Sequence, residues 1–234
     1  LLLVAMVILS IGEIPIGLAV VMARPALDWS VAPWVIAAGC AHFFYKLFLT
    51  YAYERGDLSR VYPIARGSAP LMVGLVSPFF LPDVITPVEF AGIAVLGLGI
   101  LLMAQGVFAN GENRRLIPYA LGSACATATY TLIDGQGARV SGDAVAYVAW
   151  VFVADGLIFT TVSLLWRGTG IVPRDAKSWG LATFASAASY GSYAVAVWAM
   201  TFAPLAVVAA LRETSILFAV LMGWLIFGET MTGE

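Results

Sequence analysis

Charged side chains are scarce in this sequence. Only 11% of its 234 residues are Asp, Glu, Lys or Arg, whereas a soluble domain carries roughly 25%. Hydrophobic residues make up 61% of the chain, and a water-soluble fold of this size cannot bury so much apolar surface. A disordered chain is also excluded, because disordered chains are polar and poor in aromatic residues. The composition therefore predicts an integral membrane protein.

Basic and metal-binding residues are few as well. The 12 Lys and Arg against 14 Asp and Glu give a net charge of -2, which provides no basic surface for a nucleic acid. Cys40 and Cys125 fall in apolar stretches and lack metal-ligand spacing. The single histidine, His42, excludes a His-x-x-x-His zinc pair, and no Gly-x-Ser-x-Gly motif is present. We expect no cofactor, no metal and no enzymatic activity, with intramembrane aspartyl chemistry by Asp134 and Asp155 as a remote alternative.

Apolar stretches long enough to cross a membrane occur eight times. Each has about 20 mostly apolar residues, the length that a spanning helix needs. The short breaks between them contain turn formers and charges, which predicts an all-α polytopic bundle of antiparallel helices. The chain begins within an apolar run and ends in a loop-like segment, so we expect one further span at each end. The eight predicted spans are residues 1–22, 31–53, 59–81, 88–109, 117–137, 144–166, 178–202 and 206–227.

Lysine and arginine are distributed unequally between the loops. The loops after the second, fourth and sixth spans hold seven of them, and the opposite loops hold Arg24 and Arg139. The positive-inside rule places the side with seven charges in the cytoplasm. The seven are Arg55, Arg60, Arg114, Arg115, Arg167, Arg174 and Lys177.

The two halves of the chain show a weak internal repeat. When Arg66 is aligned with Arg212, 146 residues later, Asp83 falls on Glu229 and several apolar residues also coincide. Arg66 is in the third span and Arg212 in the eighth, and an odd separation of five spans inverts the topology of the second copy. Inverted repeats are a hallmark of secondary transporters, which bind substrate between the repeats near the middle of the membrane.

Five short segments carry distinctive polar residues: HFFY at 42–45, YERGDLSRVYPIARG at 53–67, YTLIDG at 130–135, ALRETS at 210–215 and FGE at 227–229. In order and spacing they resemble the EamA-type transporters of the drug/metabolite transporter superfamily. The resemblance implies ten helices in two inverted five-helix repeats, of which this chain would contain the second to the ninth helix. The repeats would be residues 1–109 and 117–234, joined by 110–116. The family is usually drawn with both termini in the cytoplasm, opposite to the charge count, so both orientations stay open.

One turn of the second span combines several polar groups. His42, Tyr45 and Lys46 share a helical face. They would contact an anionic substrate or relay a proton, since histidine titrates near neutral pH. The alternative is a polar contact between helices.

The two arginines of the repeat are candidate substrate ligands. Arg66 lies between Pro63 and Gly67, beside Tyr62, and we expect a broken helix that lines a cavity there. A guanidinium group in such a place suits a carboxylate or phosphate. Arg212 is the counterpart in the other half, where Glu213 could neutralise it. The alternative for both is a structural ion pair.

Polar side chains also line up on later spans. Tyr130 and Asp134 belong to a one-sided stripe on the fifth span, with Ser123, Thr127 and Thr131. Tyr190 belongs to a similar stripe on the seventh span, with Ser186, Ser189 and Tyr193. We expect both stripes to line a cavity, with hydrogen bonding between helices as the alternative.

Two features bear on coupling and packing. Glu13 lies mid-span between Gly12 and Pro15, which indicates either a discontinuous helix with a protonatable carboxyl or a simple kink. Glycines repeat every seven residues on one face of the fourth span, and small residues there allow close helix packing. These glycines are Gly92, Gly99 and Gly106.

Together these features predict a secondary transporter in the plasma or inner membrane that moves a small polar or amphipathic metabolite by alternating access. Its Arg and Lys residues favour an anionic substrate, and proton coupling or gating would use Glu13, His42, Asp134 or Glu213. A flippase or exporter of a phosphorylated lipid is the alternative. The expected partners are the substrate and the bilayer; a monomer should suffice, with a homodimer as the alternative.

Overall fold

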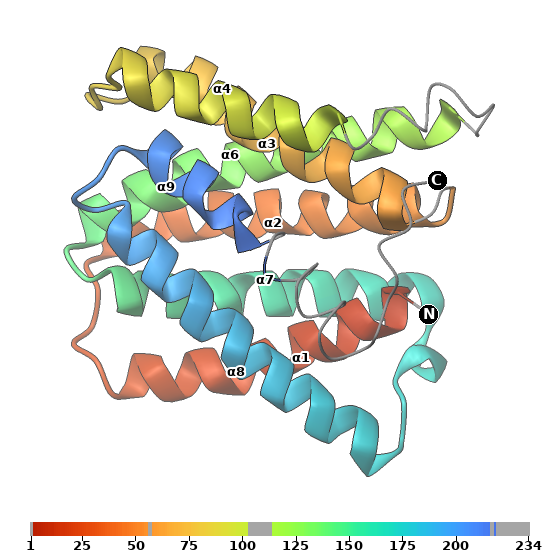
Figure 1. The fold of residues 1–234 in the computed structure, drawn as a ribbon. Coiled ribbons are helices and arrows are strands. Elements are labelled where there is room, and N and C mark those ends of the chain that lie inside the picture. Colours follow the sequence, from red (N-terminus) through yellow and green to blue (C-terminus); the bar gives the residue numbers. More distant parts are fainter. Residues whose placement is uncertain (1, 56–57, 103–113, 216–217, 219–234) are drawn as a thin grey trace.

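The computed structural model describes residues 2–55, 58–102, 114–215 and 218, without the side chains of 58–60, 62, 63 and 114. Within these segments the chain forms eight α-helices and no strand, which confirms the predicted all-α class. The helices lie side by side, with α8 crossing the others obliquely (Figure 1). Their bounds are α1 Leu2–Met22, α2 Ala32–Tyr53, α3 Leu58–Phe80, α4 Pro87–Leu102, α6 Ile117–Ser141, α7 Ala144–Arg167, α8 Ala176–Ala199 and α9 Leu205–Glu213.

The helix ends follow from local side-chain chemistry. The Asp143 carboxylate accepts the backbone N–H groups of residues 145 and 146, both at 3.1 Å, and so caps the start of α7. Asp175 caps α8 in the same way, and the backbone N–H of Ser178 that it accepts holds its pKa below the usual value. Gly142 ends α6 with a φ of 71°, a left-handed conformation that favours glycine.

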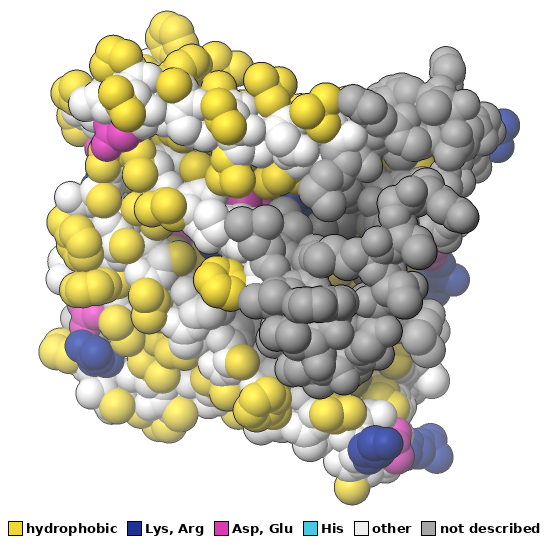
Figure 2. Space-filling view, in the orientation of Figure 1, with side chains coloured by type: hydrophobic (Ala, Val, Ile, Leu, Met, Phe, Trp, Pro, Cys, Tyr) yellow, Lys and Arg dark blue, Asp and Glu magenta, His cyan; other side chains and the backbone are white. Residues whose placement is uncertain are grey.

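The apolar surface of the bundle fits contact with lipid. In the part of the chain that the structure describes, three helices are long and apolar enough to cross a membrane by length and composition, namely Leu2–Met22, Trp29–Tyr53 and Ala144–Arg167, and two further apolar helices are shorter. Figure 2 shows hydrophobic side chains spread over the described part of the face in view, with few charged ones among them. Phe79, at 84% exposure, illustrates large apolar side chains that point outward. A water-soluble protein would not expose such a surface.

Helices from the two halves of the sequence pack against one another. From the first half, α1 packs mainly on α7 and α8, and α2 packs on α6 and α7. The contact between α1 and α7 is close because glycine occupies it: a Cβ added to Gly156 would lie 2.7 Å from the Ser10 carbonyl oxygen. The helices on either side of the predicted connection at 110–116 therefore share one core.

The predicted role of the heptad glycines is wrong for the residues that the structure describes. Gly92 and Gly99 do share a face of α4, but it is the exposed one, and no described atom lies within 4 Å of a Cβ added to either. The packed face of α4 contains Ile93, Gly97 and Ile100, and a Cβ on Gly97 would meet the Leu71 side chain at 2.5 Å. Gly106 lies outside the described residues.

Two predicted helix breaks are also absent from the described backbone. Helix α3 continues from Leu58 to Phe80 through Pro63 and Gly67, and α1 continues through Pro15. A proline removes one backbone donor, but helices tolerate it when neighbouring groups satisfy the freed carbonyl. Arg66 and Glu13 are thus presented by continuous helices.

One end of the bundle is closed by an ion pair that joins three segments. Arg139, near the end of α6, donates to both Asp83 carboxylate oxygens at 2.7 and 3.1 Å. It also donates to the carbonyl oxygens of Met200 and Ala203, in the turn between α8 and α9. Asp83 in turn accepts the backbone N–H of Leu205 at 2.9 Å. This Asp83–Arg139 clamp fixes the α3–α4 and α8–α9 connections to α6.

Candidate functional site

A cavity of about 350 Å³ lies among the helices, and most of the polar side chains that the sequence predicts to bind substrate line it. A larger cavity of about 540 Å³, near Trp29 and Trp150, is lined mainly by apolar residues. The smaller cavity is therefore the better candidate for recognising a polar molecule. Its walls are Met6, Leu9, Glu13, His42, Tyr45, Lys46, Arg66, Tyr130, Phe152, Asp155, Ser189, Ser192, Tyr193, Arg212 and Ser215.

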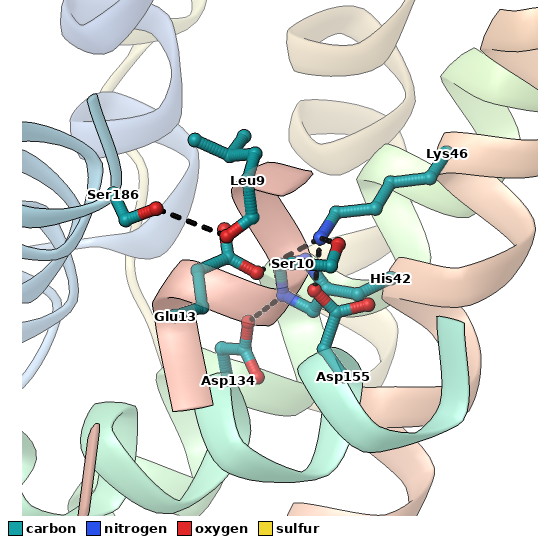
Figure 3. A network of polar contacts seen from close by, with 8 residues as sticks. All are labelled: Leu9, Ser10, Glu13, His42, Lys46, Asp134, Asp155 and Ser186. Atoms are coloured by element: carbon teal, nitrogen blue, oxygen red, sulfur yellow. Dashed lines mark hydrogen bonds and ion pairs between the residues drawn. The ribbon is translucent and has the colours of Figure 1, made fainter. Parts of the chain in front are cut away.

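The first polar group in this wall is centred on Lys46. Its ammonium donates to Ser10 Oγ at 2.7 Å, Glu13 Oε2 at 3.0 Å and Asp155 Oδ2 at 2.5 Å. The side chains of Glu13, Lys46 and Asp155 are all at least 94% buried. Figure 3 shows α1, α2 and α7 bringing these groups together. We call Ser10, Glu13, Lys46 and Asp155 the Lys46 cluster.

The second polar group is centred on Asp134 of α6, which is fully buried. His42 Nε2 lies 2.8 Å from its Oδ2, as Figure 3 shows. The hydroxyl of Tyr193 donates to the same oxygen at 2.5 Å, and that of Tyr147 donates to Oδ1 at 3.2 Å. Three helices thus converge on one carboxylate, which holds His42 and Tyr193 in place at the cavity wall.

The third polar group contains both arginines of the repeat. Arg66 Nη1 donates to Glu213 Oε1 at 3.3 Å, and Arg212 Nη2 lies 3.7 Å from the same oxygen. The guanidinium of Arg212 lies 5.9 Å from the ring of Tyr130 and 5.8 Å from that of Tyr193. Its Nε and Nη1 are buried and have no hydrogen-bond partner among the residues that the structure describes. This group has two positive charges and one negative charge at the cavity.

Aromatic rings form the wall between these groups. Tyr130 stacks on His42 with ring centroids 4.0 Å apart, and Tyr45 meets Tyr130 edge to face at 5.6 Å. Rings at such distances attract one another and present a rigid surface. The cavity can therefore contact both an anionic group and a flat or apolar one.

Comparisons with known proteins are consistent with this architecture. The model of the EamA-like transporter family matches residues 114–233. The chain belongs to this family. A solved structure titled "Crystal structure of protein" is similar, with a TM-score of 0.74 and 18% identity over 99% of this chain and 82% of that chain. No curated protein matches the sequence.

Membership of the EamA-like family makes the chain a membrane transporter of the drug/metabolite superfamily. The family model begins at Arg114, just before α6, and so covers the second of the two predicted repeats. The similar structure supports the same fold over the whole length of the chain.

The structure brings together most of the predicted site residues. The cavity wall includes Glu13, His42, Tyr45, Lys46, Arg66, Tyr130 and Arg212, while Asp134 and Glu213 lie directly behind it. Lys46, for which we predicted an anion contact, a proton relay or a polar contact between helices, binds two acidic side chains.

Two predicted ligands are not in the described wall. Tyr190 does not line the cavity, because its hydroxyl donates to the Val145 carbonyl oxygen at 3.0 Å and its ring packs on Phe152. The side chain of Tyr62 lies outside the described residues. Most of the stripe on α6 is also buried between helices, since Thr127 and Thr131 are at most 2% exposed.

Some residues that form or support the cavity wall were not predicted as site residues. Asp155 was considered only for the remote alternative of aspartyl chemistry, although acids within apolar spans are costly and usually functional. Tyr193 belonged to the predicted stripe, three residues after Tyr190, and it occupies the position predicted for Tyr190 at the cavity. Tyr147 and Ser10 gave no signal beyond being single polar residues in apolar helices.

Proposed function

We propose that this chain is a secondary transporter of a small metabolite with an anionic group, carried by alternating access across the plasma or inner membrane that its helices span. The observation that supports it is the pair of buried Arg212 nitrogens without a partner among the described residues, at the wall of a polar cavity. A buried donor without a partner is costly, and an anion would supply one. Tyr130 and Tyr193 beside it would hold an aromatic or apolar portion.

The cavity size limits the substrate. Its volume of about 350 Å³ lies at the lower end of the range of roughly 300–1,000 Å³ that is typical of small-molecule sites. A carboxylate or phosphate joined to one small ring or short chain fits this space. We propose that a monomer suffices for transport, and proton coupling is taken up below.

The test is binding of defined probes to the full-length protein in lipid nanodiscs. Phenylacetate, acetate and inorganic phosphate should be compared with benzyl alcohol, which has the ring but not the charge. We expect an anionic probe to raise the melting temperature through mass action, and benzyl alcohol to have no effect. Arg212→Gln should weaken that binding by about 10- to 150-fold, since a charge-assisted hydrogen bond contributes roughly 1.5–3 kcal/mol.

The matched control is Arg24→Gln. Arg24 is also paired with an acid, Asp143 at 3.4 Å, but lies at the exposed end of the bundle, outside the polar cavity. This variant should bind the probes as the natural protein does. Equal affinity of the natural protein and Arg212→Gln for every anionic probe would refute the proposed anion site.

A further inference from the structure

The Lys46 cluster has more acid than base. Glu13 and Asp155 each contact the Lys46 ammonium, and all three side chains are at least 94% buried. With both carboxyls ionised, the cluster would hold one uncompensated negative charge. Such a charge in a buried site is strongly unfavourable, and a carboxyl there takes up a proton instead. The cluster is electrically balanced when it holds one extra proton.

The geometry favours a proton over a metal cation. A lysine ammonium has three N–H donors, and Lys46 directs them to Ser10 Oγ, Glu13 Oε2 and Asp155 Oδ2. Sodium would have to displace this ammonium to reach the same oxygens, whereas a proton needs no additional space. Asp155 Oδ1 is buried at this site and accepts no hydrogen bond from the residues that the structure describes. It is an available position for the proton.

The surrounding charges link this proton to an anion in the cavity. The cluster itself contains Glu13 of α1 and Asp155 of α7. Beyond these, it faces the His42–Asp134 pair of α2 and α6 and the hydroxyl of Tyr193 on α8. The described ionisable side chains on α3 and α9 are those of Arg66, Arg212 and Glu213. An anion bound to these arginines adds negative charge to the same cavity, which makes protonation of the cluster more favourable.

We infer that the Lys46 cluster is a proton-binding site whose single exchangeable proton is shared by Glu13 and Asp155, and that the anionic substrate is carried together with this proton. The coupling rests on the proposed anion site, whereas the proton site itself does not. Linkage is reciprocal, so the anion tightens proton binding as much as the proton tightens anion binding. Loss of the proton at high pH should therefore weaken anion binding.

The proton site is tested without any substrate. Infrared spectra of the full-length protein in nanodiscs, titrated with pH in water and heavy water, report the C=O stretch of a protonated carboxylic acid. We expect one such group in the natural protein at neutral pH, lost at high pH. It should be absent in Glu13→Gln and in Asp155→Asn, because either change leaves one carboxylate balanced by Lys46.

The matched control for this test is Glu89→Gln. Glu89 is an acid at the start of α4 that accepts hydrogen bonds from Thr86, and it lies outside the cavity. The carboxylic-acid band should persist in this variant. Circular dichroism establishes that each variant is folded. The proton site is overturned if the natural protein lacks the band at neutral pH, or if both Glu13→Gln and Asp155→Asn retain it.

The coupling is tested by proton uptake. A pH-indicator dye in weak buffer should report up to one proton taken up per phenylacetate or acetate bound, with the probe affinity falling by up to about tenfold per pH unit above the titration of the cluster. Replacing choline chloride by sodium chloride should not change either result, and a sodium requirement would overturn the choice of a proton. Probe binding without uptake overturns coupling alone. A titrating band without probe binding overturns the proposed anion site and leaves the proton site standing.

Discussion

Breaking the Asp83–Arg139 clamp should open one end of the transporter. The Arg139 guanidinium makes four hydrogen bonds, two to Asp83 and two to the carbonyl oxygens of Met200 and Ala203. These contacts join the α3–α4 and α8–α9 connections to α6. Helices that separate at this end during alternating access would have to break them. The clamp should therefore stabilise the state in which this end is closed.

The size of the effect can be estimated from the burial of the clamp. The side chains of Arg139 and Asp83 are 20% and 9% exposed, so screening by solvent is incomplete. Hydrogen bonds to charged groups contribute about 1.5–3 kcal/mol each, but contributions within one network do not add. Arg139→Ala should thus favour the open state by roughly 2–4 kcal/mol, a shift of about 30- to 850-fold in the equilibrium between closed and open states.

The assay is thiol labelling of a buried residue next to the clamp on α6. Ala138, next to Arg139, is 1% exposed, so Ala138→Cys should react slowly with a membrane-impermeant maleimide. The background carries Cys40→Ser and Cys125→Ser, because both native cysteines are exposed. Adding Arg139→Ala should speed labelling strongly.

Arg24→Ala provides the comparison at the same end of the bundle. Arg24 pairs with Asp143 at 3.4 Å, with 44% and 25% exposure, and such surface pairs contribute at most about 1 kcal/mol. Adding Arg24→Ala to the Ala138→Cys protein should change the labelling rate by less than about fivefold. Equal rates for Arg139→Ala and Arg24→Ala, in proteins of equal melting temperature, would refute the gating role of the clamp.

Three other changes test individual contacts. Gly156→Ala places a methyl group 2.7 Å from the α1 backbone and should destabilise the protein by about 1–3 kcal/mol, whereas Gly92→Ala should stabilise it by up to about 1 kcal/mol in the same thermal unfolding assay, because alanine favours a helix over glycine. Asp143→Ala removes the cap of α7 and should lower the free energy of unfolding by about 1 kcal/mol; an unchanged value would contradict the cap. Tyr193→Phe removes a hydrogen bond to the buried Asp134 and should lower the free energy of unfolding by about 1–3 kcal/mol, whereas an unchanged melting temperature would show that this hydroxyl does not stabilise the pair.

The helices were predictable because they depend on local sequence. Runs of about 20 apolar residues and the turn formers between them are visible without any tertiary contact. The proximity of Arg66 and Arg212 could also be predicted from the sequence, because an internal repeat places equivalent residues at the interface between its copies. The structure puts both beside Glu213.

The pairing of charges was not predictable, because it depends on which helices become neighbours. Lys46 could have faced Glu13, Asp155 or the cavity alone, and the contact of α2 with both α1 and α7 decides this. The choice between Tyr190 and Tyr193 has a similar origin. Three residues on a helix differ by about 60° in direction, which is enough to aim one ring at α7 and the other at the cavity.

The interleaving of the two halves also determines the order of events during synthesis. Helices α1 and α2 enter the membrane carrying Glu13 and Lys46, while Asp155 is made more than a hundred residues later. His42 is likewise made well before Asp134, with which it pairs in the folded protein. Until α6 and α7 arrive, the early helices must keep these groups away from lipid, either by pairing with each other or with help from the insertion machinery. The contacts of Lys46 with Asp155 and of His42 with Asp134 therefore form only after α6 and α7 have been made.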